Sequence, residues 1–452
     1  MPARLLTHAG CVALACVVAR SSVASQATVR HLSVLIDRSD PSGRQAELTI
    51  DLGAPFDPKK PTVLVVEDGQ QYYVRPGAMA ALQHDLFGPD VNVAGLVPRG
   101  SDSVFVAATL RRDGSVDWLK AWRVFNSDEW IADLDAARRA LVGDSGRVDV
   151  YGRSGGAYLV HQFLSVHAAN VRRAFTQSAV EPSLNRELRI PLDDYVEQLA
   201  HTDSALLAVL RRALPPSGEA RLRALVALQR QHFYVPADSF VSTQRMLIEA
   251  LARHDTASLR RFEERYEVPG IMRLESSHDV IPQNVRVLEL IYPSGAFGDT
   301  AVAGIYPLVE SQAAFIRPLL DLVAGGKIAV RARDQRTAHR ARTQVFVLAS
   351  RGDEAVDYRT SIALANQYPV HELFVANDNH TFDEMDRVGA RALLVRRFFT
   401  GGPGSSGFIA ALAAAEPLRW RGGAAIGSWN QTKEEIIRTT TGIDGAKSTD
   451  DP

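Results

Sequence analysis

Apolar residues in the first part of the chain come in short runs separated by turn-forming residues. Several runs are rich in β-branched residues and contain almost no polar ones, as in strands buried on both faces of a sheet. The clearest run, residues 62–66, stops at Glu67-Asp68-Gly69. This pattern predicts strands at residues 31–37, 46–51, 62–66, 91–97, 148–151 and 171–176.

Amphipathic helices alternate with these runs. Ser127 or Asp128 begins a helix whose apolar residues recur at helical spacing, and Gly143 ends it. A second helix follows the run at 148–151. Alternation of strands with helices predicts an α/β fold with a mostly parallel sheet, doubly wound, that helices cover on both faces.

The pattern changes at about residue 189, after which helical periodicity dominates until about residue 330. Strand-like runs return at 343–349 and 370–376. We therefore expect a helical cap (lid) inserted into the α/β core. The expected helices of the cap are residues 195–214, 220–233, 242–253 and 309–323. The expected parts are a core at 25–188 and 331–405, a cap at 189–330 and a partly disordered tail at 406–452.

The N-terminus has the pattern of a secretory signal peptide. A short positive start at Arg4 precedes an apolar run at 9–19, and small residues end at Ala24. The run is too short for a stable membrane anchor. We expect residues 1–24 to be removed near Ala24 and the protein to be secreted or periplasmic. A lipid anchor at Cys16 is the alternative.

Composition and charge narrow the function classes. The net charge of −1 gives no basic excess, so we expect no nucleic-acid partner. Because the N-terminal apolar run is short, we also expect no stable membrane span. Both cysteines, Cys11 and Cys16, lie in the expected signal peptide, which excludes a disulfide framework and a Cys-based metal site in the remainder. The motifs imply no metal or organic cofactor. We expect a small-molecule or short-peptide substrate.

The segment from Gly152 to Gly156 matches G-x-S-x-G, with Ser154 at its centre. It follows an apolar strand directly and precedes an amphipathic helix, so the chain must turn sharply there. Flanking glycines give room for a strained backbone, and the turn exposes the Ser hydroxyl at a helix N-terminus. This context indicates a nucleophile elbow, with Ser154 as the nucleophile.

A Ser nucleophile needs a base, and the base needs an orienting acid. Asp353 comes just after the run at 343–349, and His380 comes just after the run at 370–376. Both would lie at the carboxyl edge of the sheet, where catalytic groups of open α/β folds gather. We expect Ser154, Asp353 and His380 to form a catalytic triad. Asp357 is an alternative acid, and Asp378 is adjacent to the His.

An oxyanion hole needs two backbone amides. The first is expected from Gly155, which follows the nucleophile directly. The second is expected from the loop after the run at 62–66, and Gln70 is the predicted donor.

In this order of elements the chain resembles the α/β-hydrolases, from about residue 45 to residue 400. Three segments are similar to those of the prolyl aminopeptidases (proline iminopeptidases): residues 98–103 resemble D-x-R-G-x-G-x-S, residues 133–138 resemble the helix before the elbow strand, and residues 287–292 resemble the lid segment V-L-H-E-x-I-Y. The last resemblance implies that Glu289 binds the free amino group of a substrate.

The sequence departs from that branch at the oxyanion loop. The family's H-G-G-P-G is replaced by Glu67-Asp68-Gly69-Gln70-Gln71, which has neither the His nor the Pro. We expect a serine hydrolase that forms an acyl-enzyme and acts as a prolyl-aminopeptidase-like exopeptidase. The alternatives are a carboxylesterase or lipase and a catalytically degenerate binding protein.

Overall fold

The structure is a computed structural model that describes residues 29–70, 73–235, 239–274, 278–296, 305–331, 333–353 and 355–421. The expected signal peptide at 1–24, with Ala24 and Cys16, lies outside the described residues, as does the chain after residue 421.

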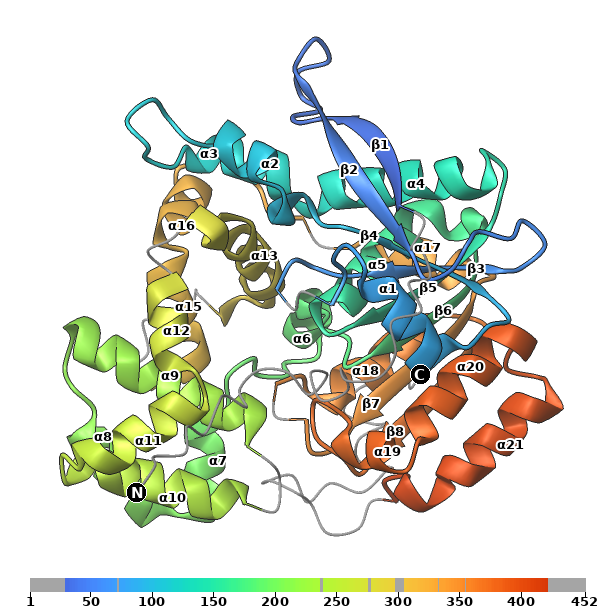
Figure 1. Cartoon of the computed structure of the whole chain (residues 1–452). Helices are drawn as coiled ribbons and strands as arrows, with labels where there is room; N and C mark the ends of the chain where they lie inside the picture. The colour runs from blue at the N-terminus through green and yellow to red at the C-terminus, as the bar shows by residue number, and fades with distance from the viewer. Residues whose placement is uncertain are drawn as a thin grey trace, which may run out of the picture.

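Within the described residues, eight strands form one sheet in the order β1-β2-β4-β3-β5-β6-β7-β8 (Figure 1). β1 pairs antiparallel with β2 and β2 with β4, whereas all neighbouring pairs from β4 to β8 are parallel. The strands are β1 (Val29–Leu35), β2 (Gln45–Leu52), β3 (Thr62–Val66), β4 (Asn92–Leu96), β5 (Val148–Arg153), β6 (Val171–Gln177), β7 (Gln344–Ser350) and β8 (His371–Ala376).

Side chains of the central strands alternate between two hydrophobic cores, one on each face of the sheet. In β3, Val63 and Val65 belong to one core, and Leu64 and Val66 belong to the other. Because successive side chains point to opposite faces, an unbroken apolar run is what a sheet covered on both faces requires.

Helices from distant parts of the sequence cover the two faces. The core that contains Leu64 is covered by α3 (Trp118–Phe125), α4 (Ser127–Val142), α5 (Gly155–His167), α17 (Gln335–Arg340) and α18 (Tyr358–Asn366). The core that contains Val63 is covered by α1 (Ala78–Leu82), the π-helix η1 (Gln83–Phe87), α19 (Asp383–Arg387), α20 (Ala390–Gly401) and α21 (Ser406–Ala415). The sheet is therefore doubly wound, as the sequence predicts.

All described elements between β6 and β7 are helical, and in Figure 1 most of them lie beside the sheet, whereas α17 covers one of its faces. Helices α7 to α12 share a hydrophobic core of their own, whereas α13 and α16 pack against α3. The helices are α6 (Pro182–Glu187), α7 (Tyr195–Thr202), α8 (Ser204–Ala213), α9 (Gly218–Tyr234), α10 (Phe240–Ala252), α11 (Thr256–Arg265), α12 (Val268–Leu274), α13 (Ile281–Ile291), α15 (Pro307–Phe315) and α16 (Arg317–Ala324).

Two helices expected in the insertion are each divided into two. Residues 195–214 form α7 and α8, because Asp203 ends the first and caps the second by accepting the amide of Leu206 at 2.8 Å. Residues 309–323 divide between α15 and α16, because Pro318 is tolerated only in the first turn of a helix.

The expected boundary of the core at residue 405 is wrong. Residues 406–415 form α21, whose Phe408 is fully buried and meets the ring of Phe346 at 5.4 Å between centroids. Farther on, the amide of Trp420 donates to the carbonyl of Val375 at 2.9 Å. The core therefore extends at least to residue 421.

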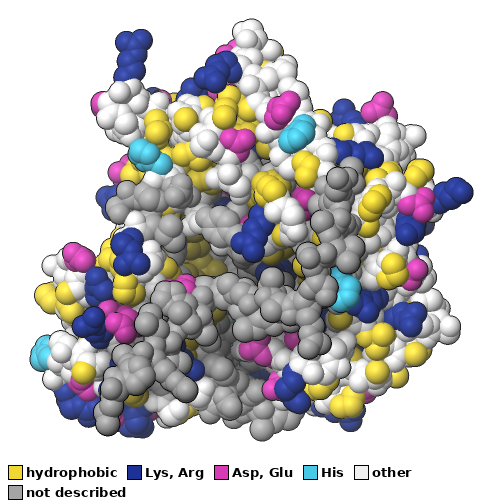
Figure 2. Space-filling model, in the orientation of Figure 1, with side chains coloured by type: hydrophobic (Ala, Val, Ile, Leu, Met, Phe, Trp, Pro, Cys, Tyr) yellow, Lys and Arg dark blue, Asp and Glu magenta, His cyan; other side chains and the backbone are white. Residues whose placement is uncertain are grey.

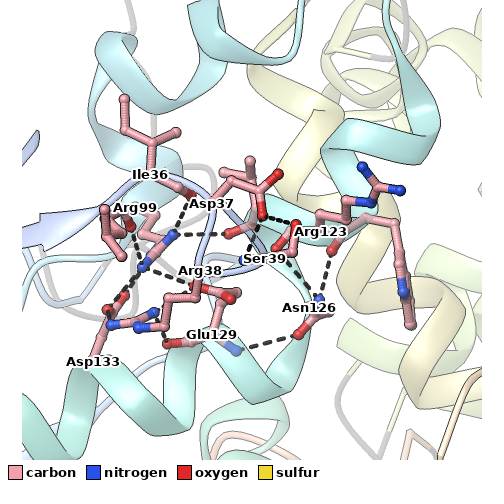
Figure 3. Close-up of polar contacts among 12 residues, drawn as sticks. Ile36, Asp37, Arg38, Ser39, Arg99, Arg123, Asn126, Glu129 and Asp133 are labelled. Atoms are coloured by element: carbon pink, nitrogen blue, oxygen red, sulfur yellow. Dashed lines mark hydrogen bonds and ion pairs between the residues drawn. The ribbon is translucent and has the colours of Figure 1, made fainter. Parts of the chain in front are cut away.

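A buried ion-pair network joins the N-terminal hairpin to α4 (Figure 3). Arg99, in the loop after β4, is 1% exposed and pairs with Asp133 at 2.5 Å and with Glu129 at 3.0 Å. Arg38 pairs with the same two carboxylates, and Arg99 also donates to the carbonyl of Ile36 at 2.8 Å. Buried charges need such partners, because a single unpaired ion there is strongly destabilising.

Over the face drawn in Figure 2, Lys and Arg side chains are interspersed with Asp and Glu. In the part of the chain that the structure covers, none of the helices combines the length and the hydrophobicity that a bilayer crossing would need.

Asp193 joins two segments of the insertion, and its burial leads to a prediction. Its Oδ2 accepts the amides of Leu308 (2.7 Å) and Val309 (3.1 Å), and burial raises its pKa from 3.8 to about 7. Between these values the unfolded chain is ionised at this position and the folded protein is protonated, so stability falls as pH rises. Asp193→Asn cannot ionise, and its amide oxygen can still accept both bonds.

We expect the unfolding free energy of the wild type, relative to Asp193→Asn, to fall by up to about 4 kcal/mol from about pH 4 to about pH 8. Denaturant titrations of both proteins across this range measure the difference. Two parallel curves would contradict the assignment.

Candidate active site

Ser154 lies at a strained turn between β5 and α5. Its backbone has φ 51° and ψ −123°, which is outside the regions that non-glycine residues usually occupy. A β-carbon on Gly152 would lie 2.6 Å from the carbonyl oxygen of Gly156, and one on Gly156 would lie 2.4 Å from that of Val66. Only glycine fits at both positions, so the G-x-S-x-G segment forms the sharp elbow that its sequence predicts.

Four adjacent parallel strands each end close to one polar side chain of the site. Ser154 follows β5, Ser178 follows β6, Asp353 follows β7, and His380 follows β8. The carboxyl ends of parallel strands share one edge of a sheet, so these side chains gather at a single edge.

The structure brings His380 and Asp353 together. The imidazole Nδ1 of His380 lies 2.9 Å from both carboxylate oxygens of Asp353, whose side chain is 1% exposed. Asp353 Oδ1 also accepts the amides of Ala355 and Val356, each at 2.9 Å. The carboxylate is therefore held by the loop after β7 and in turn orients the imidazole.

Ser178 completes this arrangement, and the sequence reading did not single it out. Its hydroxyl donates to Asp353 Oδ2 at 2.6 Å, and its amide donates to the carbonyl of Leu348 at 2.9 Å. It has a positive φ of 45° directly after β6. A signal was available, since a polar residue after a buried strand lies at the edge where the site forms.

The alternative acids have other partners. Asp357 caps α18 and pairs with Arg359 at 2.5 Å. Asp378 accepts the amides of Asn379 (2.8 Å), Glu384 (3.2 Å) and Met385 (2.8 Å). The structure therefore pairs Asp353, and neither alternative, with His380.

The loop after β3 does not provide the oxyanion donor that we predicted there. The amide of Gln70 donates to the Oδ1 of Asp68 at 3.1 Å, so Gln70 does not present the free second amide that we expected. Gly155 is the first residue of α5, where backbone amides lack partners within the helix. Asp68 lies against Gly155, since a β-carbon there would be 1.6 Å from Asp68 Oδ2.

Glu289 has both carboxylate oxygens engaged within the protein. Oε1 accepts the amide of Ser127 at 2.7 Å, and Oε2 pairs with Arg286. Burial raises the pKa of Glu289, and the charge of Arg286 lowers it in part. Glu289 thereby ties α13 to the start of α4. The structure does not support the amine-binding role that the resemblance implies.

Among the residues in the described ranges, no three His, Cys, Asp or Glu side chains come close enough together to hold a metal ion. A polar cavity lies between the core and the insertion beside Asp353, and its lining includes Glu181, Asp194 and Arg351.

Comparison with known proteins returns similarity to solved structures only. No family model matches the chain. No curated protein matches it either. The chain is similar to homoserine O-acetyltransferase from Staphylococcus aureus (14% identity, 85% of this chain and 99% of that chain, TM-score 0.43). It is also similar to the α/β-hydrolase MGS-M2 from a Medee basin deep-sea metagenome library (10%, 78% and 94%, 0.41) and to the esterase RhEst1 from Rhodococcus sp. ECU1013 (13%, 82% and 98%, 0.40).

These identities and TM-scores are too low to say anything about activity. The class of the fold follows instead from the strand order, the elbow after β5 and the helical insertion between β6 and β7. The protein has the α/β-hydrolase fold.

The contact between Asp353 and His380 generates a prediction. Asp353→Asn removes the charge that stabilises the imidazolium and lets the imidazole adopt the wrong tautomer, so kcat should fall by about three to four orders of magnitude. Asp357→Asn is the matched control: it is the same substitution four residues away and should leave kcat within about tenfold, because Asp357 caps α18 and pairs with Arg359 rather than with His380, and Asn can still cap the helix. The reverse ranking of kcat would move the acid to Asp357.

Proposed function

We propose that the protein is a serine hydrolase that cleaves an ester or an amide through an acyl-enzyme. The proposal rests on one observation: a strained Ser154 and a paired Asp353 and His380 follow β5, β7 and β8 at one edge of the sheet. In the proposed mechanism Ser154 Oγ attacks the carbonyl carbon, and His380 accepts the hydroxyl proton.

The hydrogen bond to Asp353 supports this assignment of roles. If Nδ1–H donates to the carboxylate, the neutral imidazole has its lone pair on Nε2, where it can accept a proton from Ser154. His380 then returns the proton to the leaving group, and water repeats the sequence in the second half of the reaction. The amide of Gly155 and the N-terminus of α5 favour the negative charge of the tetrahedral intermediate.

The backbone strain at Ser154 favours an enzyme over a degenerate binding protein. A non-glycine residue in this conformation lowers the stability of the fold by about 1–3 kcal/mol. Such strain is found mainly at functional sites, where the surrounding structure maintains it. Catalysis accounts for this strain, because the turn exposes the Ser154 hydroxyl at the edge of the sheet, beside the N-terminus of α5.

The finer proposal, a prolyl-aminopeptidase-like exopeptidase, shares this chemistry with the carboxylesterase or lipase alternative. Glu289 was the residue that favoured the peptidase, and its pairing with Arg286 removes that argument. The exopeptidase and the esterase or lipase functions are distinguished by comparing the hydrolysis of aminoacyl-naphthylamides with that of p-nitrophenyl esters by the same protein preparation.

Ser154→Ala should lower kcat/KM by about three orders of magnitude or more on any substrate that the wild type hydrolyses, because the nucleophile is lost. Ser165→Ala is the matched control, since Ser165 lies on the same helix and its hydroxyl donates to the carbonyl of Gln162 at 2.7 Å. Circular dichroism checks that both variants fold. A Ser154→Ala protein as active as the control would remove Ser154 from the mechanism.

A further inference from the structure

Asp68 is a buried carboxyl group that the mechanism above leaves without a role. It follows β3 in the loop where the second oxyanion donor was expected, and it is 1% exposed. Its Oδ1 accepts the amide of Gln70, whereas its Oδ2 has no hydrogen-bond partner in the described structure. A buried polar atom without a partner is costly, and such atoms in native structures call for an explanation.

The position of Oδ2 suggests what that partner is. Oδ2 lies against Gly155, so close that a β-carbon on Gly155 would be only 1.6 Å away. Gly155 follows the nucleophile directly, and an acyl oxygen turned toward its amide would come next to Oδ2. The same carboxyl group also accepts the amide of Gln70, the residue that the sequence predicted as the second donor.

We propose that Asp68 is a catalytic residue that acts as a neutral carboxylic acid, donating a hydrogen bond from Oδ2 to the substrate oxygen that becomes the oxyanion. This role rests on the proposed serine hydrolase function. An ionised Asp68 would repel the developing oxyanion, because two like charges at close range in a protein interior are poorly screened. In the neutral acid, Oδ1 remains the acceptor for Gln70, and the O–H on Oδ2 obtains an acceptor when substrate binds.

No proton is transferred in this role. Asp68 keeps its proton through the tetrahedral intermediate, and the proton of Ser154 still moves to His380 and then to the leaving group. Asp68 thus replaces a backbone amide as the second donor, in the loop that lacks the family's H-G-G-P-G sequence.

The surroundings of Asp68 are consistent with a neutral acid. Burial raises its pKa, and the charges of Arg286 on α13 and Arg153 at the end of β5 lower it in part. Tyr73 interacts electrostatically with Asp68 and with Glu67, and α5 presents the backbone of Gly155 to Asp68. Since the protonated form is the active one, activity is lost as pH rises through the pKa of Asp68.

The test compares Asp68→Asn and Asp68→Ala with the wild type, as profiles of kcat/KM against pH. Asp68→Asn places an NH₂ group where Oδ2 lies, so it keeps a donor that cannot ionise. Asp68→Ala has no donor and should be about two to three orders of magnitude less active than the wild type at pH values where Asp68 is protonated, as after removal of an oxyanion donor. Asp68→Asn should exceed Asp68→Ala by at least about tenfold and should lack the alkaline decline of the wild type.

Each other outcome overturns a specific statement. An Asp68→Ala protein as active as the wild type would mean that Asp68 is no donor, and higher activity would mean that it blocks the site. If the wild type hydrolyses no substrate, the proposed function fails, whereas hydrolysis that needs Ser154 and ignores Asp68 defeats only this inference. If Asp68→Ala does not fold, the infrared carbonyl band of protonated carboxyl groups decides: its intensity at neutral pH should be lower in Asp68→Asn than in the wild type, and an undiminished band in Asp68→Asn would contradict the proposal.

Discussion

The parallel pairing of β5, β6, β7 and β8 is the constraint on which the candidate site depends. Parallel strands that are direct neighbours end at the same edge of the sheet, so strand pairing alone brings the residues that follow them close together. Ser154, Ser178, Asp353 and His380 are separated by up to 226 positions in the sequence, yet each follows one of these four strands. The two hydrophobic cores stabilise this pairing from both faces of the sheet. The loops after these strands then need only to orient the side chains of the site.

Buried charge links the helical insertion to this edge of the sheet. Arg286 on α13 is fully buried, stacks 5.2 Å from the ring of Trp130, and lowers the pKa of both Asp68 and Glu289 against the opposing effect of burial. Because the same guanidinium acts on both carboxyl groups, the position of α13 influences the charge state beside Ser154. The insertion therefore contributes to the electrostatics of the site as well as to its cover.

Much of this arrangement could be predicted from the sequence, and the limits have physical causes. The strand at 62–66 was predictable because burial on both faces leaves an unbroken apolar run. α21 was missed because its Ala-rich sequence, SGFIAALAAA, has almost no polar face to reveal a helical period. The roles of Asp68 and Glu289 could not be predicted, because their partners, Gly155 and Ser127, lie far away in the sequence and come close only through the fold.

The central claim is that Ser154 is an activated nucleophile, and the most direct measurement is to locate a covalent bond to it. A fluorophosphonate forms a stable phosphonyl ester with a Ser that a neighbouring base activates. After reaction of the wild type, digestion and tandem mass spectrometry, the account predicts a single adduct, on Ser154. An adduct on another serine, or an unmodified Ser154 after prolonged reaction of the folded protein, would contradict it.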